Sequence, residues 1–142
     1  MTDPDRVLVP TFGRSQEEET LAYTLETFPT ADVTVLAVVT PLDAPLSEGG
    51  ILDRDDERLE AARERATHLR ESVDGATDRI DVATADGRPG TIIPQYATEH
   101  DFDHVVLSSH DTRSSDFMRR LLGRNVATTI VDRTPRPVTV LD

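Results

Sequence analysis

Hydroxyl, imidazole and guanidinium side chains are concentrated in residues 108–125, directly after an apolar run that is typical of a strand. The side chains of this segment that could bind a phosphate are Ser108, His110, Arg113, Ser114, Ser115, Arg119, Arg120 and Arg124. Arginine presents a planar fork of N–H donors to phosphate oxygens, and each hydroxyl adds one donor. The segment is therefore a candidate anion site, although arginines on an acidic surface are more often solvated or paired with carboxylates.

Several catalytic chemistries are excluded by residue types that the chain lacks. All 15 basic residues are arginines, so there is no lysine for a Gly-Lys-Ser/Thr phosphate loop, a kinase site or a Schiff base. There is no cysteine either, which excludes disulfides, thiolate metal sites and a cysteine nucleophile. His110 has no evident nucleophile partner, because neither Gly-x-Ser-x-Gly nor His-Glu-x-x-His occurs. We expect no catalytic residues.

Two acidic clusters could suggest a metal, and both have a simpler explanation. Residues 100–104 place two histidines and two aspartates close together, but the segment is expected to be the turn from a helix into a strand. The run Asp53-Arg54-Asp55-Asp56-Glu57 opens a helix, where acids complement the helix dipole without an ion. We expect no metal site.

The charge balance restricts the partners. The chain has 15 basic and 27 acidic side chains and a formal net charge of −12, which repels nucleic-acid backbones and anionic lipid headgroups. No run of 18 apolar residues and no secretory signal occur, so we expect a cytoplasmic protein with neither nucleic-acid nor membrane partners.

Seventeen aspartates, ten glutamates and no lysine are also typical of proteins from a cytosol of very high salt. At about 1 M salt the screening length is roughly 3 Å, so repulsion among carboxylates becomes small. The alternative is a GC-rich codon bias that exchanges lysine for arginine, but that bias does not explain the excess of acids. The composition therefore favours a halophilic protein.

Apolar runs of strand length alternate with segments of helical period along the whole chain, which predicts an α/β fold with a single domain over residues 1–142. The expected strands cover residues 6–10, 32–39, 79–85, 104–107 and 137–141. One expected helix follows the capping box Ser15-x-x-Glu18. The other expected helices cover residues 59–73, 91–100 and 118–133. This order is typical of an open parallel sheet with helices on both faces, in which ligands bind at the carboxyl ends of the strands.

Five pieces of the sequence, in order, resemble the universal stress protein family (UspA-like). They are Arg6-Val7-Leu8-Val9-Pro10 with Gly13, Gly87-x-Pro89, Asp103-x-Val105-Val106-Leu107-Ser108-x-His110, Leu121-Leu122-Gly123 and Pro135-x-Pro137-Val138-x-Val140. The resemblance spans almost the whole chain. It implies a Rossmann-like, five-stranded parallel sheet of order 3-2-1-4-5 and a homodimer formed through the C-terminal strand, residues 137–141.

The sequence departs from the family members that bind ATP. Those members carry Gly-x2-Gly-x9-Gly-Ser/Thr after the fourth strand, and usually an aspartate after the first. Here Ser108 and Asp111 stand at two of the glycines, and Phe12 stands at the aspartate. The final pair falls on Gly123-Arg124 or Arg124-Asn125. Asp111 would place a negative charge where a phosphate should lie, and Phe12 could fill the adenine or ribose space.

We therefore expect a non-enzymatic, stress-related regulatory homodimer that binds no ATP or other cofactor and acts through an unidentified protein partner. The first alternative is an adenine-nucleotide sensor with a rearranged phosphate loop, and the second is a nucleotide-processing enzyme on a related scaffold. The residues of the candidate cleft are Phe12, Gly13, Val39, Ser108, His110, Arg113, Gly123, Arg124 and Asn125.

Overall fold

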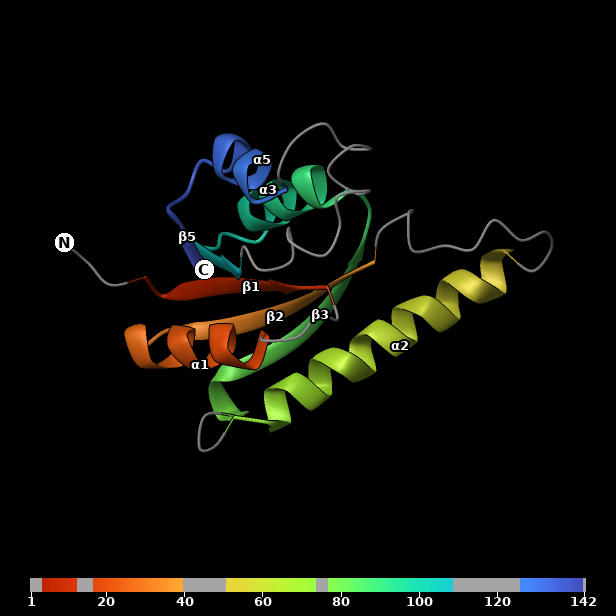
Figure 1. Cartoon of the computed structure of the whole chain (residues 1–142), viewed down its shortest axis with the longest axis horizontal. Coiled ribbons are helices and arrows are strands. Elements are labelled where there is room, and N and C mark those ends of the chain that lie inside the picture. The colour runs from red at the N-terminus through yellow and green to blue at the C-terminus, as the bar shows by residue number, and fades with distance from the viewer. Residues whose placement is uncertain (1–3, 13–16, 40–50, 74–76, 109–125, 142) are drawn as a thin grey trace.

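The computed structural model of the chain describes residues 4–12, 17–39, 51–73, 77–108 and 126–141 (Figure 1). Its strands are β1 (Arg6–Thr11), β2 (Asp32–Val39), β3 (Ile80–Asp86), β4 (His104–Ser108) and β5 (Val138–Leu141). Its helices are α1 (Glu17–Thr27), α2 (Ile51–Glu71), the 3-10 turn η2 (Thr77–Arg79), α3 (Pro89–Glu99) and α5 (Val126–Arg133). No helix within these ranges is both long enough and apolar enough to cross a membrane.

The five strands form one parallel sheet in the order β3-β2-β1-β4-β5. This confirms the strand order that the family resemblance implies. Strand–helix alternation alone could not have distinguished it from other doubly wound orders. In the central register, Thr11 of β1 lies beside Ala37 of β2, and Leu8 of β1 lies beside Val105 of β4.

Strands β1 and β2 are buried almost completely because helices cover both faces of the sheet. Successive side chains point to opposite faces, so Val7 packs into a cluster with Leu21 of α1, and Leu8 packs into a second cluster with Ile93 of α3. Figure 1 shows α1 and α2 on one side of the sheet and α3 and α5 on the other. The continuous apolar run of β2 is therefore explained, as expected, by burial on both faces.

The element boundaries differ from the expected ones by small amounts. Strand β2 has the expected bounds, whereas α2 begins at Ile51 and α3 begins at Pro89. A proline is suited to the first turn of a helix, because its missing N–H would have no partner there. Residues 118–125 of the last expected helix lie outside the described residues, as does Ser15 of the expected capping box.

Arg79 was expected to begin the third strand, but it belongs to η2. Its guanidinium Nη1 donates to the carbonyls of Ala31 and Phe28 at 2.6 and 3.1 Å, and Nη2 donates to the carbonyl of Leu25 at 3.4 Å. These carbonyls lie at the C-terminal end of α1 and just beyond it, where the helix supplies no further N–H donors and its dipole favours a cation. Arg79 therefore ties α1 to the start of β3.

Helices α3 and α5 approach closely at Gly90. A Cβ added there would lie 2.7 Å from Cγ2 of Thr129, so only glycine fits without a shift of the threonine. The Gly90 carbonyl would normally accept from the N–H of residue 94, but Pro94 has none. Arg133 of α5 donates to this carbonyl instead, at 3.4 Å, and to the Thr91 hydroxyl at 3.3 Å.

Replacing Gly90 with alanine tests this contact. In an unconstrained helix the change would stabilise by roughly 0.5–1 kcal/mol. Here we expect Gly90→Ala to lower the free energy of unfolding by about 1–3 kcal/mol, because the added methyl overpacks against Thr129. Chemical denaturation measures the loss. The matched control is Gly90→Ala with Thr129→Ser, which removes Cγ2 and should recover most of the lost stability. A Gly90→Ala variant more stable than the wild type would contradict the packing argument.

Candidate functional site

The carboxyl ends of the central strands bring three of the predicted cleft residues to one edge of the sheet. Phe12 follows β1 directly, Val39 ends β2 and Ser108 ends β4, and the register of these parallel strands places the three ends side by side. The other predicted cleft residues are Gly13, His110, Arg113, Gly123, Arg124 and Asn125, which lie outside the described residues.

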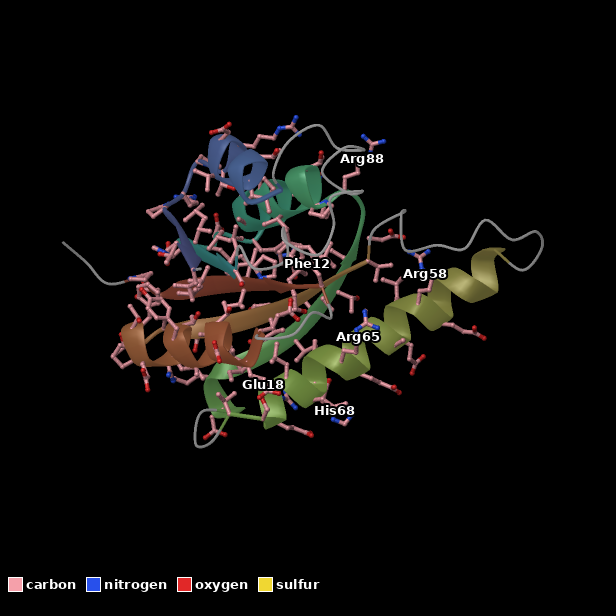
Figure 2. All side chains as sticks on the ribbon, viewed as in Figure 1. Phe12, Glu18, Arg58, Arg65, His68 and Arg88 are labelled. Atoms are coloured by element: carbon pink, nitrogen blue, oxygen red, sulfur yellow. The ribbon has the colours of Figure 1, made fainter. Side chains whose placement is uncertain are left out.

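Phe12 is part of the packed interior at this edge. Its side chain is half-buried and packs against the cluster that contains Leu8, Leu36 and Ile93, on the face covered by α3 and α5. Figure 2 labels it at the end of β1. A phenyl ring held this way offers apolar contact where a carboxylate would offer hydrogen-bond acceptors.

Glu17 is a residue at this edge that the sequence interpretation missed. It lies in the first turn of α1 and is 8% exposed, and its carboxylate accepts the backbone N–H of Phe12 at 2.8 Å. An acid in the first turn is favoured by the helix dipole, which is the signal that could have found it. The bond fixes the backbone where β1 ends and places a buried carboxyl group beside the predicted cleft.

The turn between β3 and α3 lies at the same edge and contains the expected Gly87-x-Pro89 motif. The Gly87 N–H donates to the Val39 carbonyl at 2.9 Å, which fastens the turn to the end of β2. Gly87 has a φ of 150°, a backbone conformation that residues with a side chain rarely adopt. The backbone conformation therefore requires glycine here, although a Cβ would have room. The turn places the exposed Arg88 at this end of the molecule (Figure 2).

The segment 100–104 lies at the opposite end of the strands and forms a helix-terminating turn. Asp101 has a φ of 57°, and the N–H of Phe102 donates to the Ala97 carbonyl at 2.9 Å, the pattern that commonly closes an α-helix. Oδ2 of Asp103 accepts the N–H groups of Asp5 and Arg6 at 2.9 and 3.0 Å. Its carboxylate therefore secures the start of β1, and within the described ranges no three acidic or histidine side chains are grouped as metal ligands.

His104 joins the edge strand to the rest of the sheet. Its Nε2 lies 2.7 Å from Oγ1 of Thr139 in β5, and its ring centroid lies 4.9 Å from that of Phe28. Burial lowers the pKa of this imidazole below its usual value of 6.5. The neutral ring is therefore the form that the folded protein favours.

The described side chains at the carboxyl edge combine groups that attract an anion with groups that do not. They supply the exposed guanidinium of Arg88 and the Ser108 hydroxyl, together with a phenyl ring, aliphatic groups and the Glu17 carboxylate, which already accepts a backbone N–H. The expected arginines of residues 113–124 lie outside the described part of the chain.

Comparison with known proteins gives a family and a set of similar folds. The model of the universal stress protein family matches residues 4–142. None of the curated proteins matches the chain.

Three solved structures illustrate the likeness. Hypothetical protein MJ0577 is 18% identical, with a TM-score of 0.75, over 99% of this chain and 96% of that one. UspA from Lactobacillus plantarum is 19% identical, with a TM-score of 0.68, over all of both chains. A universal stress protein in complex with cAMP is 19% identical, with a TM-score of 0.64, over 99% of this chain and 98% of that one. At these identities the likeness shows the fold alone.

The lowered pKa of His104 predicts a loss of stability in acid. Above about pH 6.5 the ring is neutral in both the folded and the unfolded state and costs nothing. As the pH falls below that value the unfolded chain takes up the proton first, so stability declines until the pH has passed through the folded pKa. Because the ring is half-exposed, we expect a small decline.

Denaturation of wild type and His104→Gln between about pH 8 and pH 5 measures this decline, since glutamine keeps a hydrogen-bonding group but does not titrate. The wild type should lose more stability than the variant, and NMR titration should give His104 a pKa below 6.5. Equal losses in the two proteins would contradict the assignment.

Proposed function

Because the chain belongs to the universal stress protein family, we propose that it is a non-enzymatic protein of the stress response that regulates or protects through contacts with other proteins, without bound ATP. Members of this family are in general stress-response proteins and not enzymes. The finer parts of the proposal, the lack of ATP binding and the action through protein contacts, rest on the carboxyl edge of the sheet.

Phe12 is the observation that carries the proposal. It stands where nucleotide-binding relatives usually have an aspartate, and its ring packs into the core cluster on the α3 face. Its backbone N–H is taken by the buried carboxylate of Glu17, at 2.8 Å. A nucleotide at this edge would therefore lack the aspartate acceptor and the Phe12 N–H donor. Asp111 in the sequence of the phosphate loop adds a negative charge.

An adenine-nucleotide sensor is the second candidate. The solved universal stress protein that contains cAMP has the same fold as this chain, so the scaffold is compatible with a nucleotide in that relative. The arginines in the sequence of residues 113–124 could supply phosphate contacts of a different kind.

A homodimer through β5 belongs to the same proposal. Strand β5 has four residues and pairs with β4 along one side, and within the described ranges no strand pairs with its other side. Val138 packs towards the α3 face and Leu141 towards the α1 face, because alternate side chains of a strand point to opposite faces, while Val140 remains 38% exposed. An uncharged edge strand of this kind is suited to pairing with a second copy.

Thermal unfolding with and without Mg-ATP tests the nucleotide question. A ligand at about 100 times its dissociation constant stabilises by about 2.7 kcal/mol, which raises the melting temperature of a domain of this size by several degrees. We expect no shift with Mg-ATP, and a partial gain of binding in the double variant Phe12→Asp with Asp111→Gly. Parallel measurement with cAMP distinguishes the sensor alternative, and a saturable rise of several degrees in the wild type with either nucleotide would refute the proposal.

Light scattering tests the dimer. The expected mass is about 31 kDa, twice the 15.7 kDa of one chain. Val140→Asp should give a folded monomer, because the exposed position tolerates the carboxylate in one chain but brings two carboxylates close together at the paired edge. Tyr23→Asp, at a similarly exposed position on α1, is the control that should remain dimeric. A monomeric wild type at high concentration would rule out this assembly.

A further inference from the structure

Strand β3 is the outermost strand on the side of the sheet opposite β5. It pairs with β2 along its whole length, from Val33 beside Ile80 to Val39 beside Asp86, and in the part of the chain that the structure describes no strand lies beyond it (Figure 1). Its backbone groups that face away from β2 are therefore available for pairing. At seven residues it is a longer edge than β5.

The middle of β3 lacks the usual protection of an edge strand. Edges are commonly blocked by charged side chains, proline or a bulge. Residues 82–85 read Val-Ala-Thr-Ala, without charge or proline, and all four are half-buried. Such small side chains allow another backbone to approach closely. The charges stand only at the two ends, where Asp81 and Asp86 are exposed.

The positions of these two aspartates favour a partner that carries positive charge over a second copy of the same chain. Two copies related by a two-fold axis would pair their β3 strands antiparallel. The register that overlaps the strands fully places Asp81 of each copy opposite Ala85 of the other and Asp86 opposite Ile80, so neither carboxylate lies opposite a cation. Opposite charges directly across a strand pair are stabilising, and a different sequence can supply them.

We propose that the β3 edge binds an extended, basic segment of another protein, which adds to the sheet as a further strand. Backbone hydrogen bonds supply the affinity, and arginine or lysine side chains five residues apart, with small or β-branched residues between them, match Asp81 and Asp86. The net charge of −12 adds long-range attraction for such a segment. The inference names the partner class for the proposed regulatory role and rests on that role.

A labelled peptide tests the charge preference. The probe is fluorescein-Gly-Gly-Arg-Val-Thr-Val-Thr-Arg, its comparison carries glutamate at both arginines, and fluorescence anisotropy at low ionic strength measures binding to the full chain. We expect the arginine peptide to bind at least about tenfold more tightly, with a preference that weakens as salt is added. Similar affinities for the two peptides would overturn the proposal.

Charge reversal on the protein assigns the site. Asp81→Arg with Asp86→Arg should reverse the preference towards the glutamate peptide. Glu19→Arg with Glu26→Arg, on exposed positions of α1, is the matched control, because either pair changes the net charge from −12 to −8. The control should retain the wild-type preference. If the two double variants had an equal effect, net charge alone would explain the binding, and the proposed site would be refuted.

Blocking the peptide backbone tests strand addition without altering the protein. One peptide is N-methylated at both valines and another at both threonines. Because alternate residues of a paired strand direct their N–H groups to the same side, one of these peptides should lose binding and the other should keep it. Equal binding of both would overturn strand addition.

Amide hydrogen exchange locates the contact. Binding of the arginine peptide should slow exchange in residues 80–86, whereas slowing confined to residues 138–141 would assign the peptide to the other edge. The mass and Mg-ATP measurements are independent of these results, so a failure here is distinguishable from a failure of the proposed function.

Discussion

Burial of β1 and β2 on both faces is the constraint on which the rest of the structure depends. Their alternating side chains fill two separate clusters, one under α1 and α2 and one under α3 and α5, so neither layer of helices can be removed without exposing a sheet face. With both faces covered, the strands can offer a partner only their ends and their outer edges. The candidate cleft, the proposed dimer contact and the proposed peptide site each use one of these places.

Arginines in this lysine-free chain satisfy backbone carbonyls at positions where secondary structure leaves them without donors. Arg79 donates at the C-terminal end of α1, Arg133 donates to the carbonyl that Pro94 cannot serve, and Arg6 donates to the carbonyl of His100 while its guanidinium lies over the ring of Phe102. An acidic surface offers many carboxylates, yet these three guanidinium groups donate to backbone carbonyls at helix ends and in the first turn of α3. Arginine suits this task because its fork of donors can serve several carbonyls at once.

The sequence was sufficient for features that depend on short-range periodicity and insufficient for contacts that join distant residues. The continuous apolar run of residues 32–39 predicted β2, because this strand is buried on both faces. The helical period of residues 59–73 predicted α2, because burial of one helix face repeats at fixed intervals. The strand order came from family resemblance. No local pattern could show that Arg79 reaches the end of α1, because this contact joins residues 48 positions apart and exists only once the layers have packed.

The bond from Asp103 to the start of β1 has a consequence for the order of events during synthesis. Its carboxylate accepts the N–H groups of Asp5 and Arg6, which precede Asp103 by 98 and 97 residues. A ribosome adds roughly 5–20 residues per second, so the start of β1 waits several seconds after its own synthesis before this partner emerges. During that interval β1 can pair with β2 but lacks β4, its neighbour on the other side. A chaperone would therefore have the most apolar strand surface to protect while only the N-terminal half of the chain has been synthesised.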